Sequence, residues 1–229
     1  MKIALCLHGL VGTDDKYGKG KKQINSKIAY GHFEKHLFEV NEQVDVFYHT
    51  WSKDKANVLK NLYNPVACLY EEQPRFSNSA REQAIYCRWL SAKKSIQLML
   101  DSGNQYDFVL FTRFDIALMV DFIFSQFDKE RFYAQGPVGP ISNGIPLIND
   151  LWFFSTPNNM ERFYTLYDHL SDDEYQMHID SNHALARKHI ISSGLNKILE
   201  YKFARPWNGV RGKRTTDTPL VRWHYFNKV

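Results

Sequence analysis

Short apolar runs that end in turn residues alternate with amphipathic stretches along most of the chain, and this alternation restricts the fold more than any other feature. Strands that alternate with helices are typical of α/β proteins, in which a largely parallel sheet lies between layers of helices. The sequence therefore predicts a Rossmann-type α/β fold with a mostly parallel central sheet flanked by helices. The length of 229 residues predicts a single domain spanning 1–229.

The expected strands are short and apolar, whereas the expected helices have apolar residues at helical spacing. The strands cover Lys2–His8, Val44–His49, Val66–Tyr70, Tyr106–Thr112, Arg131–Ala134, Leu147–Ser155 and Ile198–Phe203. The helices cover Gln23–Val40, Ser52–Leu62, Ser79–Leu100, Asn158–His169 and Asp180–Ser193. Gly and Pro residues in Gly136–Pro140 and Asn143–Pro146 predict turns.

Basic residues gather in two places, although the formal net charge is only +4. One cluster follows the first expected strand and contains Lys16, Lys19, Lys21, Lys22 and Lys27. The other is the tail 205–229, in which Arg205, Arg211, Lys213, Arg214, Arg222 and Lys228 stand against one acid, Asp217. Such clusters suit an anionic ligand, and a solvated loop and tail are the alternative interpretation. The mild overall charge makes nucleic acid an unexpected partner.

The cysteines and the hydrophobic segments indicate the compartment. Cys6, Cys68 and Cys87 are odd in number and form no C-x-x-C pair, so neither a disulfide framework nor a zinc site is expected. The apolar segment Ile3–Leu7 is too short for a signal peptide, and no run approaches the length of a membrane span. We expect a cytoplasmic protein without a transmembrane segment.

Polar residues follow three of the expected strands at the point where each strand ends. They are His8 and Gly9, His49–Trp51, and Thr112–Asp115. Open α/β sheets bind ligands beyond the carboxyl ends of their strands, so these residues are the first candidates for a binding site.

Asp115 and Arg113 are the most informative of these residues, because a buried apolar run, Phe108–Phe111, delivers both to the sheet edge. A carboxylate there can hold Mg²⁺ or Mn²⁺, which in turn bridges diphosphate oxygens. Arg113 either contacts a phosphate through two N–H groups or forms the ion pair that holds Asp115 in place. Both interpretations are open at this point.

Several motifs occur in a characteristic order along the chain. They are Ser79–Arg81, Tyr86–Ser95, Tyr106–Asp115, Asn149–Ser155 and Asp180–Leu185. In these motifs and their order, the sequence resembles bacterial capsule and viral polysaccharide glycosyltransferases of the GT-A fold. The resemblance implies a single GT-A-like domain that transfers a sugar from a nucleoside diphosphate sugar to a glycan or glycolipid acceptor.

The resemblance also implies where the donor and a metal would bind. Asp115 takes the place of the last Asp of the metal-binding D-x-D motif, and His224 is the expected second ligand of Mn²⁺ or Mg²⁺. A His among aromatic residues also serves as a packing residue, which is the alternative. The expected donor-binding residues are His8, Gly9, Leu10, Arg81, Arg88, Lys93, Arg113, Asp115, Arg211 and Lys213.

One position departs from the family pattern, because Arg113 stands where the first Asp of the motif would be. A single carboxylate then remains for the metal, so the metal is either weakly bound or dispensable. If it is dispensable, Arg113 and the tail cations Arg211, Lys213 and Arg214 would stabilise the leaving diphosphate.

A transferase that inverts the sugar's configuration needs a base near the acceptor hydroxyl. The expected bases are Asp180 and Asp150. Asp180 is also the expected N-cap of its helix, a role worth about 1 kcal/mol without any catalysis. Asp150 opens the expected strand segment Leu151–Phe154, where it would otherwise bind donor or acceptor hydroxyls.

Two other classes of function are open. One is a non-catalytic nucleotide-sugar or glycan-binding protein of the same fold, which the incomplete metal motif favours. The other is a nucleic-acid-binding domain that uses the basic tail together with Trp207 and Trp223.

Overall fold

The computed structural model describes residues 1–11, 25–142 and 145–202, and within these it describes the side chains of all but 138–142 and 145–146. Several predictions lie outside the described residues: most of the first basic cluster (Lys16, Lys19, Lys21 and Lys22), and the basic tail with Arg211, Lys213, Arg214 and His224.

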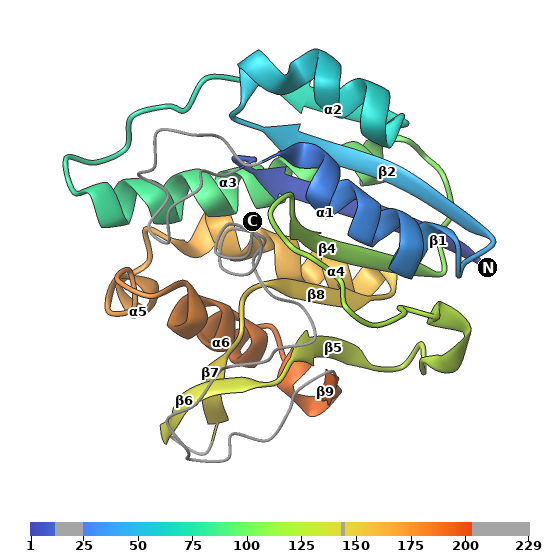
Figure 1. Ribbon diagram of the computed structural model, residues 1–229. Coiled ribbons are helices and arrows are strands. Elements are labelled where there is room, and N and C mark those ends of the chain that lie inside the picture. The colour runs from blue at the N-terminus through green and yellow to red at the C-terminus, as the bar shows by residue number, and fades with distance from the viewer. Residues whose placement is uncertain (12–24, 143–144, 203–229) are drawn as a thin grey trace, which may run out of the picture.

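Seven strands form one sheet in the order β3-β2-β1-β4-β8-β5-β9 (Figure 1). Their bounds are β1 Lys2–Gly9, β2 Gln43–Thr50, β3 Ala67–Tyr70, β4 Phe108–Arg113, β5 Phe132–Gln135, β8 Trp152–Ser155 and β9 Leu199–Lys202. The pairs β2–β3, β1–β2, β1–β4 and β5–β9 are parallel, and β8 runs antiparallel to both of its neighbours. The predicted α/β fold with a mostly parallel sheet is confirmed.

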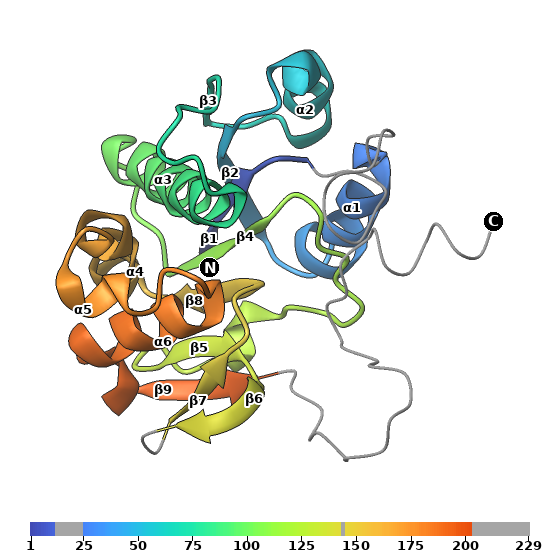
Figure 2. The same ribbon diagram turned by 90° about the vertical axis from the view of Figure 1, so that its left-hand side faces the viewer.

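Helices cover both faces of the sheet (Figure 2). The α-helices are α1 Ser26–Phe33, α2 Ala56–Tyr63, α3 Ala80–Asp101, α4 Pro157–Tyr164, α5 Asp173–Gln176 and α6 Asn182–Ser192. A π-helical turn, Glu34–Phe38, extends α1, and short 3-10 helices lie at Lys53–Lys55, Phe124–Gln126, Thr165–His169 and Leu195–Lys197. In the part of the chain that is described, none of the helices combines the length and apolar composition needed to cross a membrane.

The central strands are continuous apolar runs because both of their faces are buried. In β1, Ile3, Leu5 and Leu7 pack in one core cluster with residues of α1 and α2. Ala4 and Cys6 point the other way, into a second cluster with residues of α3, α4 and α6. Burying a large apolar side chain contributes about 1.5–3 kcal/mol, so this two-sided core fixes the register of the strands.

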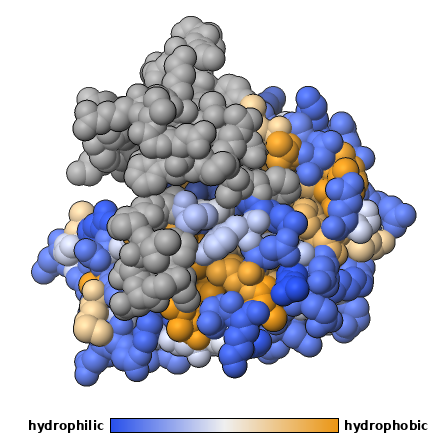
Figure 3. Space-filling view, turned by 90° about the horizontal axis from the view of Figure 1, so that it is seen from below, coloured by the Kyte–Doolittle hydropathy of each residue, from blue (hydrophilic) through white to orange (hydrophobic). Residues whose placement is uncertain are grey.

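Away from the core, the described surface that is seen from below is mainly hydrophilic, with an apolar area near its middle (Figure 3).

The structure corrects three predicted elements. The expected strand Leu147–Ser155 is two strands, β7 Ile145–Ile148 and β8, and the loop Asn149–Leu151 separates them. The expected turn Gly136–Pro140 lies largely in β6 Pro137–Ser142, which pairs with β7 as a separate antiparallel ribbon. Proline is tolerated there because an edge strand need not use every N–H group.

The third correction concerns the start of α6. The expected cap, Asp180, is wrong, because Ser181 is the N-cap and its Oγ accepts a hydrogen bond from the backbone N of Ala184 at 3.3 Å. An N-cap side chain reaches the N–H group two or three residues ahead, so Asp180 lies one residue too early. Asp180 is exposed.

Candidate functional site

Three polar residues form a row across the carboxyl ends of neighbouring strands. His8 of β1 lies in register with His49 of β2 on one side and with Arg113 of β4 on the other. Side chains alternate between the two faces of a strand, so all three lie on the face of Ala4 and Cys6, which α3 covers. The structure thus brings together the three strand ends that the sequence singled out.

On the β4 side of this row lies a group of buried and partly buried polar side chains, which we name the Asp150 cluster: His8, Arg88, Arg113, Asp115 and Asp150. Arg113 donates from Nε to Oδ1 of Asp115 at 2.8 Å and from Nη2 to Oδ2 at 2.6 Å. The exposed fraction of Asp115 is 1%. Both carboxylate oxygens therefore have a partner, as expected of the ion pair that was one of the two interpretations of Arg113.

Asp150 enters the cluster from the loop between β7 and β8. Arg88 of α3 places Nη1 at 2.5 Å from Oδ2 of Asp150, and its Nη2 donates to the backbone oxygen of the same residue. On the other side, Nδ1 of His183 lies 3.1 Å from Oδ1 of Asp150. The buried carboxylate of Asp150 is therefore in contact with side chains from both α3 and α6.

The charges of this cluster balance, with two arginines against two aspartates. Burial lowers the pKa of Arg88 to about 10, although Asp150 opposes the shift. Burial alone would raise the pKa of Asp150, but attraction to Arg88, His183 and Arg113 outweighs it and lowers the pKa. For Arg113, attraction to Asp115 and Asp150 outweighs burial, and the pKa is raised. These three groups are charged at neutral pH.

His8 differs from its neighbours because neither of its ring nitrogens has a hydrogen-bond partner within the described part of the chain, although the residue is 1% exposed. Its ring stacks on Phe111 at 4.4 Å. Burial, reinforced by repulsion from Arg88 and Arg113, holds its pKa well below the usual value, so the imidazole is neutral. A buried polar group without a partner costs about 1–3 kcal/mol. A ligand that accepts one hydrogen bond and donates another would remove that cost.

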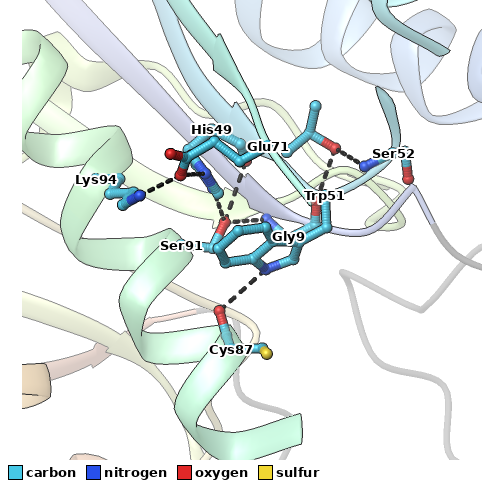
Figure 4. Close-up of polar contacts among 9 residues, drawn as sticks. Gly9, His49, Trp51, Ser52, Glu71, Cys87, Ser91 and Lys94 are labelled. Atoms are coloured by element: carbon cyan, nitrogen blue, oxygen red, sulfur yellow. Dashed lines mark hydrogen bonds and ion pairs between the residues drawn. The ribbon is translucent and has the colours of Figure 1, made fainter. Parts of the chain in front are cut away.

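On the β2 side of the row, Gly9, His49, Glu71, Ser91 and Lys94 form a second group, which we name the His49 cluster (Figure 4). Nδ1 of His49 lies 2.7 Å from Oγ of Ser91, and Nε2 lies 3.0 Å from Oε2 of Glu71. Glu71 also binds Lys94. Burial lowers the pKa of His49 to about 4, so its ring is neutral and donates to the Glu71 carboxylate.

Gly9 is held by this cluster rather than left open to a ligand. Its φ of +94° lies in a region that favours glycine. Its N–H donates to Oγ of Ser91 at 2.8 Å, and its carbonyl accepts from Oγ1 of Thr50 at 2.8 Å. The next residue, Leu10, is 50% exposed. Both backbone polar groups of Gly9 are therefore already used.

Two of the other expected cations lie apart from the Asp150 cluster. Arg81 donates to the backbone oxygen of Asp180, and Lys93 forms an ion pair with Asp168. Neither contacts a residue of the cluster through a recorded hydrogen bond or ion pair in the described part of the chain. Their assignment to the donor site stays a prediction.

The expected metal site lies only partly within the described residues. No group of three or more His, Cys, Asp or Glu side chains within 1–11, 25–142 and 145–202 could hold a metal ion. Asp115 offers one carboxylate, and Arg113 already occupies both of its oxygens. The other expected ligand, His224, lies outside the described residues, so the metal site stays a prediction.

Sequence reasoning missed Glu71, Ser91, Lys94 and His183. Glu71 follows β3 directly, so the rule that found His8 and Asp115 would have found it too. The other three lie within helices and within two motifs of the family resemblance, Tyr86–Ser95 and Asp180–Leu185, but only the three-dimensional contacts show which side chains of those motifs meet the two clusters.

No protein-family model matches the chain, and no curated protein matches it. Among solved structures, the chain is similar to the crystal structure of a glycosyltransferase involved in the glycosylation of the major capsid of PBCV-1. The two share 10% sequence identity with a TM-score of 0.46, over 90% of this chain and 82% of that one.

Proposed function

We propose that the chain is a glycosyltransferase that transfers a sugar from a nucleoside diphosphate sugar to a glycan or glycolipid acceptor, with the donor bound at the Asp150 cluster. The position of this cluster carries the proposal. β2 and β3 lie on one side of β1 and β4 lies on the other, so the strand order reverses between β1 and β4. Ligands of open α/β sheets bind at such a switch point, beyond the carboxyl ends of the strands.

His8 supports a ligand at this position. It lies one residue before the end of β1, beside the switch point, and its two ring nitrogens have no hydrogen-bond partner among the residues that the structure describes. Buried polar groups in folded proteins are nearly always satisfied, and an exception calls for a specific explanation. A bound sugar nucleotide supplies both donors and acceptors through its base and its hydroxyls.

Arg113 supports a phosphate at the same place. A guanidinium has five N–H groups, of which Asp115 takes two, so three remain for other partners. The Arg113 side chain is 22% exposed, against 1% for Asp115. We assign to Arg113 the role of stabilising the negative charge on the leaving diphosphate. Asp115 holds the guanidinium of Arg113 in place. Both interpretations of Arg113 then apply at once.

The alternative is a non-catalytic nucleotide-sugar-binding protein of the same fold. The mutual pairing of Arg88 with Asp150 and of Arg113 with Asp115 favours it, because such pairs offer little net charge to a substrate.

A thermal-shift screen with UDP-, GDP- and dTDP-glucose, each with and without Mn²⁺, tests the proposal. A donor at 100 times its Kd would stabilise the native state by about 2.7 kcal/mol. Release of nucleoside diphosphate from the bound donor then separates the enzyme from the binding protein. The arms with and without Mn²⁺ test whether a divalent metal assists donor binding or is dispensable.

Arg113→Lys sharpens this test, because lysine keeps the charge beside Asp115 but lacks the planar fork of N–H groups. We expect donor binding to weaken at least tenfold. The matched control is Arg131→Lys, because Arg131 pairs with Asp128 at the surface, where its side chain is 47% exposed. If the two variants bind the donor equally well, the phosphate does not lie at Arg113.

A further inference from the structure

His183 occupies an unusual position beside the Asp150 cluster. It lies in the first turn of α6, and its Nδ1 is 3.0 Å from the backbone oxygen of Ile148 and 3.1 Å from Oδ1 of Asp150. A carbonyl and an ionised carboxylate can only accept, so Nδ1 must carry the hydrogen. In the neutral ring, Nε2 therefore holds a free electron pair.

This electron pair is accessible. Nε2 makes no recorded hydrogen bond with any residue that the structure describes, and the His183 side chain is 40% exposed. The Asp150 side chain behind it is 7% exposed. The pair thus has a buried carboxylate, which orients the ring, and an imidazole that reaches the surface. This is the arrangement by which a carboxylate fixes the tautomer of a catalytic histidine.

The surrounding contacts keep this pair in place. Arg88 holds the second oxygen of Asp150 at 2.5 Å. The adjacent loop residue, Leu151, accepts a hydrogen bond through its backbone oxygen from Oγ1 of Thr112 at 3.0 Å. Thr112 belongs to β4, directly before Arg113, so the histidine is tied to the strand that presents the proposed phosphate contact.

The two expected bases are less suited to accept a proton than His183. Asp150 is buried, its oxygens are occupied by Arg88 and His183, and protonation would break its ion pair with Arg88. Asp180 is exposed, and among the described residues its carboxylate has no recorded hydrogen bond that would orient it.

We propose that His183 is the general base of the transfer and that Asp150 is the residue that positions it. This inference rests on the proposed function. The acceptor hydroxyl gives its proton to Nε2 of His183 while its oxygen forms a bond to the anomeric carbon of the donor. The bond from that carbon to the diphosphate oxygen breaks, and the diphosphate leaves with the electron pair. The Asp150 carboxylate stabilises the imidazolium. A single displacement of this kind inverts the configuration at the anomeric carbon.

The test uses the full chain and the donor that stabilises it most in the screen, with water in place of the acceptor hydroxyl. His183→Gln should slow the release of nucleoside diphosphate by about 10²–10⁴-fold, the usual contribution of a general base. Donor-induced thermal stabilisation should stay unchanged. His178→Gln, another histidine just before α6, is the matched control and should keep the wild-type rate.

The pH profile supplies a readout that a purely structural role would not move. The wild-type rate should rise with pH as the base loses its proton, and this rise should be absent from His183→Gln. In Asp150→Asn the rise should move to lower pH, because the imidazolium loses the adjacent charge.

The outcomes separate this inference from the function on which it rests. If no donor stabilises the wild-type protein, or a bound donor is never cleaved, the proposed transferase activity is wrong. The assignment of His183 as its general base is then wrong as well. If the wild-type protein cleaves the donor and His183→Gln does so within threefold of that rate, the transferase stands and the assignment of His183 is overturned.

Discussion

The His49 cluster and the Asp150 cluster lie side by side on the same sheet edge, yet their polar groups are satisfied to different degrees. In the His49 cluster, each of the side chains of His49, Ser91, Glu71 and Lys94 has a protein partner. In the Asp150 cluster, both ring nitrogens of His8 and Nε of Arg88 are buried and form no hydrogen bond with residues 1–11, 25–142 or 145–202. The hydrogen bonds of the His49 cluster are explained by their role in holding the fold together. The unsatisfied groups of the neighbouring Asp150 cluster point to a ligand.

The largest expected effect comes from breaking the charge balance of the Asp150 cluster. Asp150→Ala would leave the buried Arg88 without its counterion, and removing one partner of a buried ion pair costs about 3–5 kcal/mol. Chemical denaturation would show this fall in the free energy of unfolding. The control is Asp168→Ala, whose pair with Lys93 is partly exposed, so its loss should cost no more than about 1 kcal/mol. Equal effects would mean that the buried pair contributes no more than a surface pair.

The second-largest loss of stability is expected when acid protonates the ring of His49. The pKa of His49 is about 4 in the folded protein, against 6.5 as its ordinary value. The unfolded chain therefore takes up a proton first, and stability that is fully present above pH 6.5 is lost as the pH falls towards 4. A shift of this size corresponds to about 3 kcal/mol. Denaturation curves of wild type and His49→Gln between these pH values check it, and identical pH slopes would refute it.

A smaller effect is expected from Ser91→Ala, which removes the acceptor of the Gly9 N–H and the partner of Nδ1 of His49. The partly buried Gly9 N–H and the buried His49 ring each lose a hydrogen bond, so the free energy of unfolding should fall by about 1–3 kcal/mol. Ser95→Ala is the matched control, because Ser95 is equally buried one turn later and, among the described residues, bonds only the carbonyl of Ala92. If Ser91→Ala is less stable but still binds the donor, the His49 cluster serves stability and not donor binding.

The smallest and opposite effect is expected at His8. Replacing it by leucine removes two unsatisfied nitrogens and keeps an apolar contact with Phe111, so stability should be unchanged or rise by about 1 kcal/mol. A fall of several kcal/mol would show that His8 has a structural partner after all.

The central strands could be predicted from the sequence because burial on both faces leaves a continuous apolar run. Expected and observed bounds of β1, β2 and β4 agree to within two residues. The ribbon of β6 and β7 could not be predicted, because Pro137 and Pro140 are typical of turns and become strand residues only on an edge.

The site could be predicted only where a strand delivers a polar residue to the sheet edge. His8, His49 and Arg113 obey that rule. The pairing of Arg88 with Asp150 joins residues 62 positions apart, and no local pattern encodes it. The motif Asp180–Leu185 contains His183, but only the contact with Asp150 distinguishes this residue from the others in the motif.

Calorimetric titration of UDP-, GDP- and dTDP-glucose into wild type, His8→Leu and Ser91→Ala tests the central claim most directly. If the donor binds at the Asp150 cluster, at least one donor binds the wild-type protein, His8→Leu weakens its Kd at least tenfold, and Ser91→Ala stays within threefold. The claim is contradicted if none of these donors binds the wild-type protein, or if the bound donor has the same Kd for His8→Leu as for wild type.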